Sequence, residues 1–123
     1  MAKRKLMIVM VNTDPRDPTQ LGAPFFQASV AAAMEFECEV VMTGRAGQLA
    51  VKGVAEAIRI KPDSPKTVYD FIKDAHEAGA KFKVCAPTLD LWGSDLIPEV
   101  DETVGGAYVI EQAMEDDVVT FTY

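Results

Sequence analysis

One short segment near the start of the chain constrains the fold more than any other. Residues 6–11 form a continuous apolar run, and the polar loop Asn12-Thr13-Asp14-Pro15 ends it. A short run without alternation between apolar and polar residues is typical of a strand that is covered on both faces. Strands of this kind belong to parallel sheets with helices on the two faces, so the run favours an α/β fold.

The next two segments continue this pattern. Apolar residues recur along residues 21–36 at the spacing of one helix face, and Pro24 is tolerable there only in the first turn of a helix. A second short run, residues 38–43, closes at Gly44. The order strand, helix, strand predicts a β-α-β unit.

The middle of the chain is less uniform. Residues 45–60 permit a helix, although residues 57–60 also fit a short strand, and both alternatives stay open. After a loop, Ser64 and Pro65 precede an apolar stripe that ends at Gly79. This pattern predicts a helix with Ser64 as its N-cap and Pro65 in its first turn.

The last third of the chain predicts two more strands. Residues 82–86 and 118–121 fit strands, a turn falls around Trp92 and Gly93, and residues 104–114 fit a helix. Alternating strands and helices imply a parallel sheet with helices on both sides. With 123 residues, the chain can bury about two-thirds of its unfolded surface, so we expect one domain over residues 1–123 without a structural metal or disulfide.

The charge of the chain excludes several classes of partner. Twelve basic and 19 acidic residues give a net charge of −7, which repels nucleic-acid phosphates and anionic lipid headgroups. The longest uncharged stretch is too short and too polar to span a membrane. Residues 1–5 are positively charged, but the apolar run after them is too short for a signal peptide. We therefore expect a cytoplasmic protein with Cys38 and Cys85 reduced.

The first predicted helix is apolar on more than one side. Phe26, Val30 and Ala33 lie away from its core-facing stripe, and no charge occurs between Asp17 and Glu35. A monomer would expose this surface, so we expect a subunit interface to cover it. Burial beneath loops of the same chain is the alternative.

Candidate chemistry gathers at one edge of the predicted sheet. Ligands of open parallel sheets bind beyond the carboxyl ends of the strands, which selects residues 12–17, 43–47, 85–90 and the tail after 121. Only Cys85 among them is a strong nucleophile. Thr88 fits the N-cap of a short helix beside it, Asp90 competes for the same N–H groups, and Lys83 shares the strand parity of Cys85.

The surroundings of Cys85 limit its chemistry. A helix N-terminus stabilises a thiolate by about 0.3–1 kcal/mol, so we expect reaction with an already activated sulfur species rather than acyl transfer. The alternative is that Cys85 is a small buried hydrophobe. Cys38 begins a strand at the opposite edge and is expected to be structural. His76 is expected to be solvated, and one histidine without a close cysteine pair supports neither a zinc site nor a Cys-His pair.

Two further residues remain candidates for ligand binding. Asn12 opens a loop that is acidic, stiffened by proline and lacks the glycines with which phosphate-binding loops wrap their ligand, which excludes P-loop and Rossmann sites and disfavours flavin phosphate. Thr19 and Gln20 could still bind a ligand there. Trp92 is a candidate lid near Cys85, or it packs under a turn.

The motif around Cys85 resembles a known family. A strand at residues 82–86 ends in cysteine; Gly93, residues 95–100, the helix start at Gly105 and Gly106, and the closing segment 117–121 follow it. This order resembles the DsrE/DsrF-like family, most closely over residues 67–123.

The resemblance implies a fold and a function. It implies a three-layer α/β/α fold with a mostly parallel, five-stranded sheet, and homo-oligomers such as trimers or hexamers. It also implies a sulfur carrier or sulfurtransferase that holds sulfane sulfur as a persulfide on Cys85, with a TusA-like carrier or a rhodanese-type donor as partner. This chemistry requires no metal or organic cofactor. The alternative hypothesis is a non-catalytic oligomeric binding module in which Cys85 has only a structural, packing role.

Overall fold

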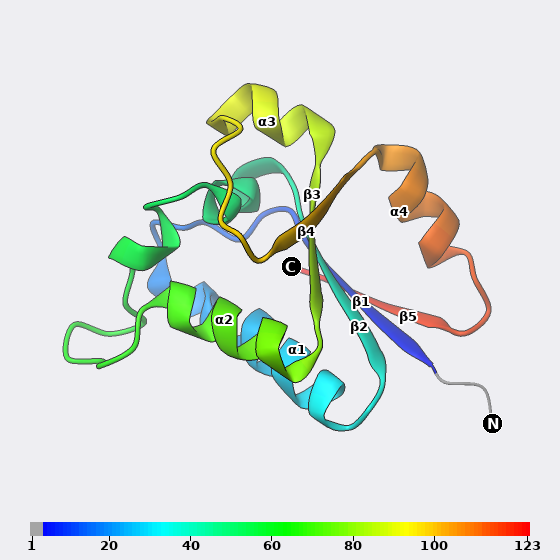
Figure 1. The fold of residues 1–123 in the computed structure, drawn as a ribbon, viewed down its shortest axis with the longest axis horizontal. Helices are drawn as coiled ribbons and strands as arrows, with labels where there is room; N and C mark the ends of the chain where they lie inside the picture. Colours follow the sequence, from blue (N-terminus) through cyan, green and yellow to red (C-terminus); the bar gives the residue numbers. More distant parts are fainter. Residues whose placement is uncertain (1–3) are drawn as a thin grey trace.

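The computed structural model describes residues 4–123 and is built around one sheet (Figure 1). Residues 1–3, which belong to the charged start weighed above as a signal peptide, lie outside the described residues. The sheet has the order β4-β3-β2-β1-β5, and each neighbouring pair is parallel. Its strands are β1 (Lys5–Met10), β2 (Glu37–Met42), β3 (Lys81–Cys85), β4 (Val100–Val104) and β5 (Val118–Thr122).

Helices cover both faces of this sheet. On one face α1 (Gly22–Ala33) packs beside α2 (Val68–Ala78), and on the other lies α4 (Gly106–Ala113). The short helix α3 (Ala86–Trp92) follows β3 at the carboxyl edge of the sheet. The predicted three-layer α/β/α fold is therefore confirmed, with every strand pair parallel. Within residues 4–123 no helix has the length and apolar character needed to cross a membrane.

Two apolar clusters explain the uninterrupted run that forms β1. Ile8 and Met10 point into the main core beneath α1 and α2, whereas Met7 and Val9 point into a smaller core beneath α4. Residues 7–10 of β1 are buried because packed helices cover both faces of the sheet, while β2 and β5 pair with its two edges. Both side-chain sets must then be apolar, as the sequence predicted.

The second long helix begins later than predicted. Thr67, not Ser64, is the N-cap of α2: the Asp70 amide donates to Thr67 Oγ1 at 3.3 Å, and the Thr67 amide donates to Asp70 Oδ2 at 2.9 Å. Ser64 donates to the Lys66 carbonyl in the preceding turn instead, and Pro65 lies outside the helix. A capping box satisfies two helix-end donors at once, which favours Thr67 over a lone serine. The predicted end at Gly79 is confirmed.

The edge strand β4 was not predicted, and the helix expected from Val104 begins two residues later. Most of β4 is exposed, so it lacks an apolar signal. Asp101 joins it to its surroundings: the Phe82 amide donates to Asp101 Oδ2 at 2.9 Å where the β3–β4 register shifts, and His76 Nε2 lies 3.1 Å from Asp101 Oδ1. His76 is thus a partner of Asp101, and with 35% of its side chain exposed it remains a partly solvated histidine, as expected.

Residues 45–60 form neither of the two expected elements. They contain the 3₁₀ helices η2 (Gly44–Ala50) and η3 (Ala55–Ala57), separated by a turn. Between them, Val51 forms a single antiparallel bridge with Leu96. Short 3₁₀ segments have no apolar period long enough to appear in the sequence, because they rarely exceed one or two turns.

Candidate functional site

Cys85 is the last residue of β3 and the N-cap residue of α3. It pairs in register with Val104, the last residue of β4. After Cys85 the chain turns to the α1–α2 side of the sheet, where Leu89 of α3 packs against the main core. After Val104 it turns to the opposite face, where Tyr108 of α4 packs against the smaller core.

This divergence defines a specific place in the fold. In open parallel sheets, ligands bind outside the carboxyl ends of two adjacent strands whose connections leave to opposite faces. In this chain β3 and β4 are such a pair, and Cys85 lies at the point where their connections separate. The predicted position of the thiol at the ligand-binding edge of the sheet therefore agrees with the structure.

The Cys85 side chain is largely covered. It is 8% exposed and packs in the smaller core with Met7, Val9, Val41 and Val104. The next two residues after Val104, Gly105 and Gly106, are exposed, and a Cβ atom built on either would meet open space. The Cys85 thiol is thus covered, and it lies beside two glycines that present no side chain.

A buried polar cluster lies on the same face of the sheet as Cys85. Lys83 Nζ donates to Tyr108 Oη at 2.6 Å and lies 3.0 Å from Glu102 Oε1. The Glu39 carboxylate, only 3% exposed, accepts from Tyr108 and forms ion pairs with both Lys83 and Lys5. Two lysines thus share one buried carboxylate between β1, β2, β3 and α4.

The cluster limits how far Lys83 can favour a Cys85 thiolate. Burial disfavours the ammonium form, but hydrogen bonds to Tyr108 and Glu102 outweigh it and raise the pKa of Lys83 above its usual value. Lys83 therefore stays protonated, yet Glu39 and Glu102 balance its charge. Sequence reasoning found Lys83 and missed Glu39 and Tyr108. A charged residue between apolar neighbours in a central strand was the available signal for Glu39.

Thr88 and Asp90 do not have the predicted roles. The helix begins at Ala86, so Cys85 occupies the N-cap position and Thr88 lies inside the helix. Thr88 is 2% exposed and packs against Gly47 of η2, and its Oγ1 has no hydrogen-bond partner within residues 4–123. Asp90 is exposed on α3. The sequence placed the cap late because threonine is a common N-cap and cysteine is not.

Asn12 and Trp92 lie at a cleft that is separate from the surroundings of Cys85. They help to line a cleft of about 610 Å³ at the carboxyl edge, together with Asp14, Arg16 and Arg45 and with Val11, Gly44, Gln48 and Leu91. The Trp92 indole N–H donates to the Gly44 carbonyl at 2.7 Å. Cys85 is not part of this lining; the length of α3, about 10 Å, separates it from Trp92. Trp92 is therefore not a lid over the thiol.

Cys38 contrasts with Cys85. It lies near the amino end of β2, is 4% exposed and belongs to the main core on the other face of the sheet. Burial raises the pKa of its thiol to about 11, which suppresses the reactive thiolate. Its predicted place at the opposite edge is confirmed. Within residues 4–123, no three His, Cys, Asp or Glu side chains are grouped so that they could hold a metal ion.

Comparison with known proteins identifies a solved structure with the same fold and the family of this chain. The chain is similar over its whole length to the crystal structure of the ychN protein from E. coli, with a TM-score of 0.72, 16% sequence identity, and coverage of 98% of this chain and 100% of that chain. At this identity the likeness shows a shared fold. No curated protein sequence matches significantly. The model of the DsrE/DsrF-like family matches residues 5–121, and the chain therefore belongs to the DsrE/DsrF-like family.

Proposed function

We propose that this protein is a cytoplasmic sulfur carrier or sulfurtransferase that accepts and donates sulfane sulfur on Cys85. The observation that carries the proposal is the place of Cys85 where the β3 and β4 connections leave to opposite faces. Family membership supports the same reading, because sulfur relay is the chemistry associated with DsrE/DsrF-like proteins. Cys38, at the opposite edge with a raised pKa, is a poor alternative.

The proposed transfer is a thiol exchange in two steps. The Cys85 thiolate attacks the outer sulfur of a donor persulfide, the donor S–S bond breaks, and the donor leaves as a thiolate. Cys85 then carries the outer sulfur and its proton as a persulfide. A thiolate of the acceptor attacks that sulfur in turn and releases the Cys85 thiolate. No net oxidation or reduction occurs, so no redox cofactor is needed.

The covered thiol favours small donors over large ones. Only 8% of the Cys85 side chain is exposed, which admits a polysulfide or a persulfide at the end of a flexible segment. A TusA-like carrier or a rhodanese-type donor would approach it beside Gly105 and Gly106, two exposed residues that carry no side chain. In the alternative hypothesis the protein is a non-catalytic binding module, and the same burial makes Cys85 a packing residue.

Intact-mass analysis after incubation with inorganic polysulfide separates these readings. We expect the parent protein and Cys38→Ser to gain the mass of a sulfur atom, and Cys85→Ser to gain none. Reduction with a thiol should return the original mass. An unmodified parent protein, or equal modification of Cys85→Ser, would contradict the proposal and favour the binding module.

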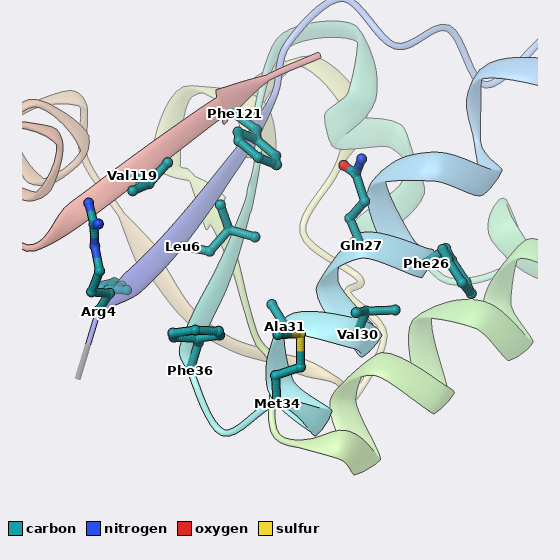
Figure 2. A pocket seen from close by; sticks show the side chains of 11 residues that line it. Arg4, Leu6, Phe26, Gln27, Val30, Ala31, Met34, Phe36, Val119 and Phe121 are labelled. Carbon is teal, nitrogen blue, oxygen red and sulfur yellow. The ribbon is translucent and has the colours of Figure 1, made fainter.

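We propose in addition that the carrier is a homo-oligomer, a trimer or a hexamer, joined through α1. Figure 2 shows Phe26 and Val30 of α1, and Met34 directly after this helix, beside an apolar groove that reaches Val119 and Phe121 of the edge strand β5. Phe26 is 68% and Met34 61% exposed, so no segment within residues 4–123 covers them. The charged residues in the groove lining are Arg4 and Lys5 and none is acidic, so the negative charge of the chain is not concentrated on this face.

Light scattering on a sizing column tests this interface. We expect the parent protein to have the mass of three or more chains and Phe26→Asp to shift towards the monomer, because the new carboxylates would be buried unpaired. Leu91→Asp is the matched control, since Leu91 is similarly exposed on α3, away from the groove. A monomeric parent protein, or an unchanged mass for Phe26→Asp, would refute the interface.

A further inference from the structure

We propose that the cleft between the loop after β1, the 3₁₀ helix η2 and the end of α3 binds a small organic anion. The ligand class is a molecule with a single carboxylate, sulfonate or phosphate group and a planar apolar part. The site is built from Asn12, Asp14, Arg16, Arg45 and Trp92. It does not include Cys85, and it stands independently of sulfur transfer.

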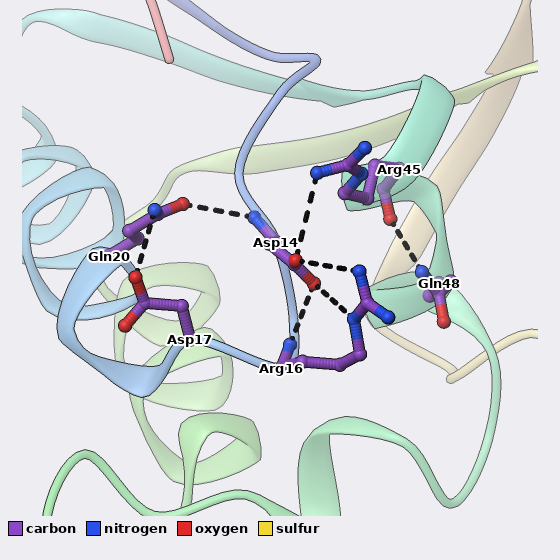
Figure 3. A network of polar contacts seen from close by, with 6 residues as sticks. All are labelled: Asp14, Arg16, Asp17, Gln20, Arg45 and Gln48. Carbon is purple, nitrogen blue, oxygen red and sulfur yellow. Dashed lines mark hydrogen bonds and ion pairs between the residues drawn. The ribbon is translucent and has the colours of Figure 1, made fainter.

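The charge of the cleft is opposite to that of the chain. The charged residues in its lining are Arg16, Arg45 and Asp14, two positive side chains against one negative, in a protein with net charge −7. Asp17, the next carboxylate along the loop, is held away from the arginines by Thr19 and Gln20, as Figure 3 shows for Gln20. A cleft that concentrates positive charge attracts anions in preference to other ligands.

Asp14 holds the arginines without using all of their donors. Arg16 donates to it through Nε at 3.2 Å and through Nη2 at 3.1 Å, which keeps the pKa of the Asp14 carboxyl below its usual value. Arg45 Nη1 lies 3.6 Å from Asp14 Oδ2, too far for a hydrogen bond. Figure 3 shows Arg45 joined to Asp14 by this ion pair alone. The Arg45 guanidinium lines the cleft, and its planar fork of N–H groups is available to bind an oxyanion.

The Trp92 indole provides an aromatic surface in the same cleft as the arginine donors. The hydrogen bond from the Trp92 indole to the Gly44 carbonyl fixes the ring, and 40% of the side chain remains exposed. Leu91 extends the apolar surface, and the Asn12 and Gln48 amides add hydrogen-bonding groups. A fixed aromatic surface with a few polar groups converging on one side is the usual composition of a small-molecule site.

The loop after β1 favours an anion with a single oxyanion group. The loop from Asn12 to Asp17 contains no glycine, so its backbone cannot wrap a diphosphate. Considered by itself, the loop from Asn12 to Asp17 is acidic. Arg45 comes from η2, which follows the neighbouring parallel strand β2, and it is this juxtaposition that makes the cleft attractive to an anion.

Trp92 is the only tryptophan of the chain, so its fluorescence reports directly on the cleft. The probe is phenyl phosphate, titrated at constant ionic strength and followed by Trp92 fluorescence and by calorimetry. We expect a saturable change and weaker binding of inorganic phosphate, which lacks the ring. Arg45→Gln should weaken binding of phenyl phosphate by about tenfold, the loss of one charge-assisted contact. Asp14→Asn should strengthen it several-fold, because a competing carboxylate is removed.

Two controls make the result specific. Arg59→Gln removes the same charge at a residue that bonds to the Ser64 carbonyl, outside the cleft lining, and should bind phenyl phosphate as the parent protein does. Cys85→Ser should also bind normally, which separates this site from the proposed sulfur chemistry. The proposal is overturned by the absence of saturable binding in calorimetry, by equal effects of Arg45→Gln and Arg59→Gln, or by weaker binding to Asp14→Asn.

Discussion

Glu39→Gln is expected to lower the free energy of unfolding by about 3–5 kcal/mol, the usual cost of breaking a buried ion pair from one side. Glu39 is 3% exposed and is the shared partner of Lys5 and Lys83, whose side chains are 14% and 11% exposed. The amide keeps the size of the carboxylate but leaves two covered ammonium groups without their common counter-charge. Urea denaturation followed by circular dichroism measures the loss.

A surface ion pair supplies the matched control. Lys52 Nζ lies 3.4 Å from Asp95 Oδ1, and both side chains are more than half exposed. Asp95→Asn therefore removes one carboxylate from an ion pair in water, and its expected cost is about 0–1 kcal/mol. If Glu39→Gln cost no more than Asp95→Asn, the buried cluster would not contribute to stability as argued.

Gly47→Ala is the second substitution with a large expected effect. A Cβ atom on Gly47 would lie 2.0 Å from Thr88 Cγ2, with Thr88 Cβ at 3.2 Å behind it. Such overlap in a packed interior costs about 1–3 kcal/mol or more, because α3 and η2 must move apart. Since α3 begins directly after Cys85, we also expect polysulfide labelling of Cys85 to change in rate.

Two further variants test whether the loss of stability comes from the overlap between a Cβ atom on Gly47 and Thr88. Gly106→Ala adds the same methyl group where a Cβ atom meets open space, at the first residue of α4, and should not destabilise the protein. Thr88→Ser removes Cγ2, so adding it to Gly47→Ala should recover part of the lost stability. Equal urea midpoints for Gly47→Ala and Gly106→Ala would show that the α3–η2 contact is loose.

The central strands and main helices were accessible to sequence reasoning because their burial is strong and local. β1 and β2 lie between paired neighbours, so their apolar runs had one consistent interpretation. The Gly79 end of α2 was also readable, because its φ of +119° favours glycine. The edge strand β4 was not readable: its exposed residues satisfy their pairing with β3 alone and need no apolar pattern.

The candidate sites likewise contain some features that the sequence predicted and others that it did not. The parity of Lys83 and Cys85 on one face, and the place of Cys85 at a strand end, followed from the alternation of side chains along a strand. The partners of Lys83 did not follow, since Tyr108 lies on α4 and Glu39 on another strand. The same holds for Arg45 beside Asp14, which were recognisable only as members of two separate loops.

Local pattern was therefore sufficient for the layered parallel fold and for the position of the thiol, because each depends on periodicity within a few neighbouring residues. The burial of Cys85, the lysines that share Glu39 and the arginine cleft depend on which strands become neighbours in the sheet. Such contacts join residues tens of positions apart, and their strength comes from exclusion of water and from charge balance. Those properties exist only after the layers have packed together.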